Sequence, residues 1–216
     1  MKKLKLGVLA SGRGSNLQAI IDNIEAGRLS AEIAVVISDQ SDAFALERAK
    51  KHNLAAVHVS SKGYKGRREE YDALLVAELH KRNVDLVVLA GFMRIITKVL
   101  VQAFPNRIMN IHPALLPSFP GLHVQKAAIE HGVRFSGCTV HFVDEGMDTG
   151  PIIIQAVVPV LDHDTEDSLA ARILKQEHKI FSRAIQFYAE GKLTVQGRQV
   201  RVTGEQPDDE AFLVNP

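Results

Sequence analysis

The chain has 216 residues and carries 26 Lys and Arg against 25 Asp and Glu, a near-neutral balance that argues against nucleic-acid binding and attachment to an anionic membrane. Its single cysteine, Cys138, excludes an intrachain disulfide and argues against a cysteine-based metal site. No apolar run approaches membrane-spanning length, and glycines interrupt the N-terminal apolar stretch too early for a signal peptide, so we expect a cytoplasmic protein.

The first half of the sequence alternates strand and helix patterns. Four short apolar stretches are typical of strands covered on both faces, namely residues 4–10, 33–38, 84–90 and 107–111, with 55–59 as a weaker fifth. Helical patterns fill the gaps around residues 17–24, 43–52 and 67–82. In the third, Tyr71, Leu74, Leu75 and Leu79 form the expected apolar stripe. This alternation predicts a doubly wound, mostly parallel α/β sheet.

The second half begins with a proline-rich stretch and contains longer elements. We expect a helix over 124–131, strands over 134–143 and 151–160, and a long helix over about 165–190 that an Asp/Thr/Glu/Asp cluster begins. If any peptide bond before proline is cis, Leu116–Pro117 is the candidate. No linker divides the chain, so we assign residues 1–193 to one domain and 194–216 to a C-terminal tail, with a hairpin packed on that domain as one interpretation of the tail.

The segment SGRGSN, residues 11–16, follows the first strand and precedes the first helix. Glycines allow a tight turn, and the N–H groups at the helix start favour an anion such as phosphate. The dinucleotide fingerprint G-x-G-x-x-G is incomplete, because Leu17 stands at its third glycine position. A plain turn with Ser15 or Asn16 as the helix cap explains this stretch equally well.

Asn110 and His112 lie two residues apart at the carboxyl end of a predicted strand, just before three prolines. Residues i and i+2 of a strand share a face, and open α/β sheets bind ligands at this edge. Asn can stabilise an oxyanion, and His can transfer a proton near neutral pH. The alternative is a half-buried histidine that only closes the strand.

Two further features carry carboxylates. The loop VDEGMDTGP, residues 143–151, holds three acids, and its composition fits a solvated turn, although one acid near His112 would favour the imidazolium. Glu177 falls on the apolar stripe of the last helix, where it either needs a buried partner or reaches solvent at the helix edge. The histidines show no metal-binding spacing, so we expect no metal.

Four segments together resemble the folate-dependent formyltransferases: SGRGSNLQAII, VVLAGFMRI, NIHPALLPSFPGLH and HFVDEGMDTGPII occur in the order and at the separations of that family. The resemblance covers the chain from Leu4 to about Leu193 and implies a Rossmann-like fold. It implies transfer of the formyl group of 10-formyltetrahydrofolate, as co-substrate, to the amine of N1-(5-phospho-D-ribosyl)glycinamide (GAR) in purine biosynthesis. It requires no metal, nucleic acid or membrane, and leaves a monomer or a homodimer open.

The resemblance also assigns residues. It implies Asn110, His112 and Asp148 as the catalytic set, and thereby selects one acid of the 143–151 loop. For GAR it implies Gly14, Ser15 and Asn16 at the phosphate, and Glu177. For the folate it implies Arg68 (with Arg67 as the alternative register), Met93, Arg94, Ile95, Ile96, Asn110, Asp144, Glu145, Gly146, Met147 and Asp148.

Three alternatives compete with this interpretation. Methionyl-tRNA formyltransferase normally has an additional basic domain, and 10-formyltetrahydrofolate hydrolase an additional N-terminal domain; we expect neither here. A non-catalytic nucleotide-binding module of Rossmann type would explain Gly12 and Gly14. It would leave Asn110, His112 and the MDTGP segment without a role.

Overall fold

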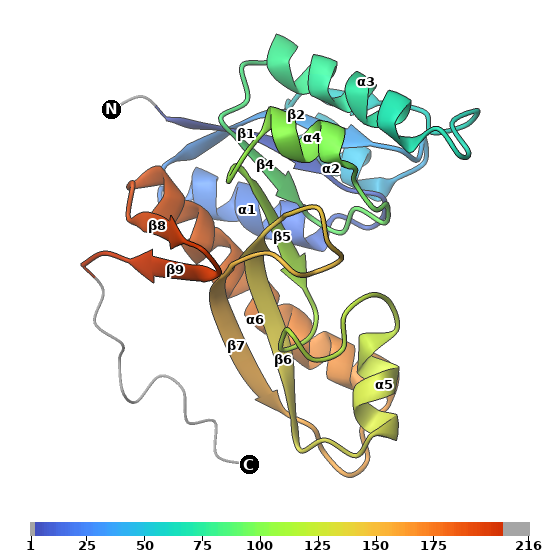
Figure 1. Cartoon of the computed structure of the whole chain (residues 1–216), viewed down its shortest axis with the longest axis vertical. Helices are drawn as coiled ribbons and strands as arrows, with labels where there is room; N and C mark the ends of the chain where they lie inside the picture. Colours follow the sequence, from blue (N-terminus) through green and yellow to red (C-terminus); the bar gives the residue numbers. More distant parts are fainter. Residues whose placement is uncertain (1–2, 205–216) are drawn as a thin grey trace.

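The computed structural model describes residues 3–204, and these form a twisted sheet of nine strands with helices on both faces (Figure 1). The strands are β1 Leu4–Leu9, β2 Ala31–Ser38, β3 Ala56–His58, β4 Leu86–Leu89, β5 Ile108–His112, β6 Phe135–Phe142, β7 Ile152–Pro159, β8 Leu193–Gln196 and β9 Gln199–Val202. The helices are α1 Ser15–Glu25, α2 Phe44–Lys51, α3 Arg68–Lys81, α4 Lys98–Ala103, α5 Val124–Glu130 and α6 Glu166–Ala189.

The strand order is β3-β2-β1-β4-β5-β6-β7-β9-β8. The first five of these strands pair in parallel, and β6 then runs antiparallel to both β5 and β7. The predicted doubly wound, mostly parallel α/β architecture is therefore confirmed. The order reverses between β1 and β4, so that the carboxyl ends of β1, β4 and β5 share the edge where such sheets bind ligands.

Two apolar cores lie on the two faces of the sheet. One joins strand residues such as Val8 and Val88 to α1, α2 and α6, whereas the other joins Leu9 and Leu89 to α3 and α4. Neighbouring residues of one strand thus point to opposite cores, as the strand period requires. Figure 1 shows the same division, with α3 and α4 on one side of the sheet and α1 and α6 on the other.

A local sequence signal explains where α6 begins. Thr165 caps α6 by accepting from the Ser168 N–H, and the Ser168 hydroxyl accepts from the Thr165 N–H, a complete capping box. One expectation was wrong, and one helix was not predicted. Leu74 is 42% exposed and does not belong to the buried stripe of α3. The helix α4 was not predicted, because its six residues place only Leu100 in the core and show too short a pattern.

Three further features concern the loops and the C-terminal region. The Leu116–Pro117 bond is cis, at the position that the sequence analysis singled out. After α6 the chain forms an antiparallel β8–β9 hairpin, which joins the sheet through the pair Ile152 and Gln199. The rest of the predicted tail, residues 205–216, lies outside the described residues. None of the helices in the described region is long and apolar enough to cross a membrane.

Candidate active site

Asn110 and His112 occupy the carboxyl-terminal half of β5, as the sequence predicted. Asn110 is half-buried and pairs with Leu89 of β4 on one side and with His141 of β6 on the other. His112 is only 4% exposed. Because both residues come from alternate positions of one strand, their side chains leave the sheet on the same face.

The contacts of His112 define the tautomer of its ring and the partner of each ring nitrogen. Its Nε2 lies 2.8 Å from the carbonyl oxygen of Phe119, and a carbonyl can only accept, so Nε2 carries a hydrogen. Its Nδ1 lies 3.5 Å from Oδ2 of Asp148. Nδ1 is therefore the ring nitrogen that faces the carboxylate.

Asp148 reaches His112 because of an unusual backbone conformation. Its φ of 55° lies in the left-handed region, and this turns the side chain inward, where it is 14% exposed. The Gly121 N–H donates to its Oδ2 at 2.9 Å. Of the three acids in the 143–151 loop, this is the one that contacts His112, so the loop is more than the solvated turn that its composition favoured.

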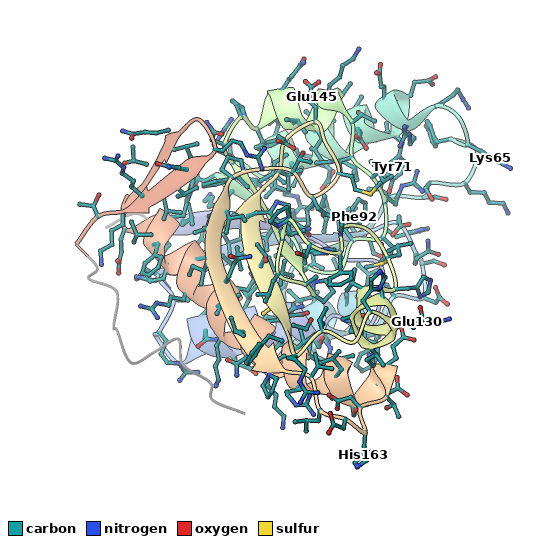
Figure 2. All side chains as sticks on the ribbon, turned by 60° about the horizontal axis from the view of Figure 1, so that its bottom comes forward. Lys65, Tyr71, Phe92, Glu130, Glu145 and His163 are labelled. Atoms are coloured by element: carbon teal, nitrogen blue, oxygen red, sulfur yellow. The ribbon has the colours of Figure 1, made fainter. Side chains whose placement is uncertain are left out.

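The remainder of that loop is organised around Asp144. Its Oδ1 accepts hydrogen bonds from the Gly146 N–H at 3.0 Å and from the Thr149 hydroxyl at 2.6 Å. Glu145 and Met147 are exposed on the outer side of this turn, and Figure 2 shows Glu145 at the periphery of the molecule. The structure thus separates the five predicted loop residues: Asp148 faces the catalytic set, Asp144 closes the turn, and the intervening three face solvent.

His141 is a site residue that sequence reasoning missed. Its Nδ1 lies 2.8 Å from the Phe142 carbonyl and so carries hydrogen, which leaves Nε2 to accept from the Asn110 amide nitrogen at 3.2 Å. The same Nε2 is 3.8 Å from Oδ1 of Asp148. Burial lowers the pKa of His141, which favours the neutral form of this imidazole. The feature that links His141 to the site is its position opposite Asn110, and this position could be known only from the register of β5 and β6.

The loop of residues 11–16 turns sharply into α1. Gly14 adopts a left-handed conformation with φ 67°, and a Cβ at this position would approach Ala45 to 2.8 Å, so only glycine fits. The alternative of Ser15 or Asn16 as the cap is wrong, because Gly14 is the N-cap and no side chain caps the helix. No side chain of the described residues therefore caps the first N–H groups of α1, which is the arrangement that an anion site requires.

Asn16 and Glu177 form a buried pair between α1 and α6. The Asn16 amide nitrogen donates to Oε2 of Glu177 at 2.7 Å, and the two side chains are 8% and 7% exposed. Desolvation raises the pKa of Glu177, and the bond from Asn16 opposes that rise. Of the two readings of Glu177, the buried partner is the right one. Within residues 3–204, Asn16 Oδ1 has no hydrogen-bond partner, an unmet acceptor at the start of α1.

Four of the residues predicted to contact the folate lie on the loop between β4 and α4, and we call them the folate wall: Met93, Arg94, Ile95 and Ile96. Met93 and Ile95 are 67% and 54% exposed, and Leu122 and Met147 are also exposed large apolar side chains. Met147 lies close to Gly121, since a Cβ on that glycine would be 3.6 Å from its sulfur. Exposed apolar side chains that come from separate loops are typical of a ligand-binding surface.

Two arginines near this wall differ in their contacts. Arg67 donates to Glu70 and to the Gly63 carbonyl, whereas Arg68 forms no hydrogen bond or ion pair with any described residue. Both line a cavity of about 370 Å³ beside Thr97. In the folate wall itself, the Arg94 guanidinium lies 4.5 Å from the ring centroid of Tyr71. Figure 2 shows that Tyr71 lies nearer the centre of the molecule than Lys65 does. Because Arg68 forms no hydrogen bond or ion pair within the described residues, we favour it over Arg67 as a ligand contact.

The sequence pattern of the formyl transferase family matches residues 4–185. The chain belongs to the formyl transferase family. It is 41% identical to phosphoribosylglycinamide formyltransferase from Escherichia coli (strain K12), over 98% of this chain and 100% of that protein. A solved structure of glycinamide ribonucleotide transformylase 1 from Symbiobacterium toebii superposes with a TM-score of 0.90 at 52% identity, over 93% of this chain and 94% of that one.

Some of the relatives that match this chain are much longer than it. The trifunctional purine biosynthetic protein adenosine-3 of Drosophila melanogaster is 48% identical over 88% of this chain. The match spans only 14% of that protein's length, so the comparison concerns one part of it. The family resemblance that the sequence suggested is confirmed, whereas the role of each site residue stays a prediction.

Proposed function

We propose that this protein transfers the formyl group of 10-formyltetrahydrofolate to the amine of GAR, a step of purine biosynthesis. The observation that carries the proposal is the contact of His112 Nδ1 with Asp148 beside Asn110, at the ligand-binding edge of the sheet. A full-length relative named for this reaction supports it.

The proposed reaction begins with attack of the neutral GAR amine on the formyl carbon. This forms a tetrahedral intermediate with an oxyanion. One N–H of the Asn110 amide is held by His141, and we assign the second to that oxyanion. Loss of such a donor typically slows a reaction by about 100- to 1,000-fold.

Collapse of the intermediate breaks the bond between the formyl carbon and the folate nitrogen. That nitrogen must gain a proton, and the attacking amine must lose one, so the proton count is unchanged overall. We assign this transfer to Nδ1 of His112, whose charged form Asp148 stabilises at 3.5 Å. Acid–base assistance of this kind contributes roughly 100- to 10,000-fold. The step uses no metal and no covalent bond to the protein.

The substrates would be held at two places. We assign the GAR phosphate to Gly14, Ser15 and Asn16, where N–H groups begin α1, and the rest of GAR to Glu177. The folate would lie against Met93, Arg94, Ile95 and Ile96, with Arg68 at its anionic end and residues 144–148 beside its ring. Holding two reactants in register removes much of the entropic barrier.

A single assay separates this proposal from its rivals. Formation of tetrahydrofolate is followed by absorbance with 10-formyltetrahydrofolate alone and then with GAR added. We expect product only when GAR is present. Product without GAR would identify a hydrolase, and no product under either condition, together with tight NAD binding, would identify a nucleotide-binding module.

A further inference from the structure

Ser11, the first residue of the 11–16 loop, connects three strand ends through one hydroxyl group. Its Oγ lies 2.6 Å from Oδ1 of Asp39, which follows β2, and 2.9 Å from the backbone nitrogen of Met93, which follows β4. The Ser11 N–H also donates to the Gly91 carbonyl at 2.9 Å. Ser11 therefore joins its own loop to the segment that carries the folate wall.

The direction of these hydrogen bonds is fixed by their partners. A carboxylate only accepts, so the Ser11 hydrogen points at Asp39, and a lone pair of the same oxygen receives the Met93 N–H. Asp39 is 7% exposed, and Gln40 Nε2 holds its second oxygen at 2.8 Å. A partly buried, charge-assisted bond of this kind is stronger than a neutral one and orients the hydroxyl.

The two segments that meet at this oxygen serve different substrates in the proposed function. Residues 14–16 of the loop lie at the GAR phosphate, and Met93 is the first residue of the folate wall. We propose that Ser11 is a positioning residue that sets the distance between the two substrate sites. The inference rests on the proposed function and adds a residue that none of its steps uses.

Arg48 provides a matched comparison, because it holds the same loop from another direction. Its Nε donates to the Arg13 carbonyl at 2.9 Å and its Nη1 to Gln18 at 2.9 Å, and neither partner belongs to the folate wall. Loss of Arg48 would loosen the phosphate loop and leave Met93 in place. The two residues therefore predict different kinetic patterns from the same loop.

The test compares Ser11→Ala, Ser11→Thr and Arg48→Gln in the GAR-dependent assay, with thermal unfolding of each. Removal of one hydrogen-bonding group weakens a contact by about 2- to 10-fold, so Ser11→Ala should raise KM for both substrates by that factor. Displacement of one reactant against the other should also lower kcat by roughly 10- to 100-fold. Ser11→Thr keeps the hydroxyl and should recover most of the loss. Arg48→Gln should raise KM for GAR alone.

Ser182→Ala serves as a control, since it removes a buried α6 hydroxyl that contacts Asn23 and neither substrate segment. If Ser11→Ala does not fold, Ser11→Cys replaces it with the same expectations. Wild-type constants in Ser11→Ala, or a KM change confined to one substrate, would overturn the inference while the proposed function stands. Absence of GAR-dependent product in the wild type would overturn both.

Discussion

Nδ1 of His112 and Oδ2 of Asp148 lie 3.5 Å apart, although the two residues come from β5 and from the loop that follows β6. The opposite nitrogen of the ring is committed to the Phe119 carbonyl. The carboxylate is held by the Gly121 N–H. The imidazole and the carboxylate are thus each held by a backbone group, which fixes their positions relative to one another.

Asp148→Asn should keep the fold and lose most of the activity. Asn retains an oxygen that accepts from Gly121, but its neutral amide no longer stabilises the charged form of His112. We expect kcat to fall roughly 100- to 10,000-fold with a much smaller change in KM. Asp162→Asn, which alters a side chain that is 74% exposed, is the control. An Asp148→Asn enzyme with near wild-type turnover would remove Asp148 from the mechanism.

His141 should act through Asn110, because it accepts from the amide that we assign to the oxyanion. Asn110→Ala removes the donor, so kcat should fall about 100- to 1,000-fold. His141→Asn leaves the donor in place without its fixed orientation, and we expect a smaller loss. The double variant should be no slower than Asn110→Ala alone. If steady-state kinetics showed that the two substitutions lower kcat independently, so that their effects multiply in the double variant, His141 would not act through Asn110.

The pH dependence of stability offers a separate test of His141. Burial lowers its pKa below the ordinary value of about 6.5. Below pH 6.5 the His141 imidazole therefore binds a proton more readily in the unfolded chain than in the folded chain. The free energy of unfolding consequently decreases as the pH falls through that value. Denaturant unfolding between pH 7.5 and 5.5 should show a shallower decline for His141→Asn than for the wild type. Parallel profiles would show that His141 does not contribute.

The positions of Asn110 and His112 and the turn at residues 11–16 were predictable, because they depend on local sequence patterns. The strand period places Asn110 and His112 on one face, and the βα alternation places them at the carboxyl edge of the sheet. Gly12 and Gly14 likewise indicate a tight turn before a helix. These inferences use distances of a few residues, over which the backbone geometry is nearly fixed.

The partners of these residues were not predictable from local patterns. Asn16 and Glu177 are 161 positions apart and meet only because α1 packs on α6. His141 contacts Asn110 through the register of an antiparallel pair. Asp148 turns inward through a positive φ that no Asp–Thr–Gly sequence dictates. Each contact depends on tertiary packing, and the family resemblance supplied Asp148 where spacing left three acids open.

Arg94 should depend on the Tyr71 ring for its orientation toward the folate. The guanidinium lies 4.5 Å from the ring centroid, and the Tyr71 hydroxyl donates to the Val59 carbonyl at 2.8 Å. A cation–π contact contributes about 0.5–2 kcal/mol, so Tyr71→Leu should raise KM for 10-formyltetrahydrofolate by roughly 2- to 30-fold. Tyr71→Phe keeps the ring and should leave this KM close to wild type. An equal rise in both variants would assign the effect to the hydroxyl.

Glu177 should make the protein less stable as the pH rises. Desolvation raises the pKa of this carboxyl above its ordinary value, so the folded state holds a proton that the unfolded state has already released. The contribution to stability is complete below about pH 4.3, the unfolded value, and is lost as the pH rises through the folded value. A glutamine at this position does not titrate and keeps an oxygen that can accept from Asn16.

We therefore expect the free energy of unfolding of Glu177→Gln to exceed that of the wild type by a margin that grows from pH 4 to pH 7. Asn16→Ala should have the opposite effect, because it leaves a buried carboxylate without its donor and costs about 1–3 kcal/mol or more at neutral pH. Both variants should bind GAR more weakly, which separates stability from function. Glu130→Gln, whose side chain is 63% exposed, is the control. Urea titrations across this range provide the measurement, and a Glu177→Gln margin that stays constant with pH would show that the carboxyl titrates normally.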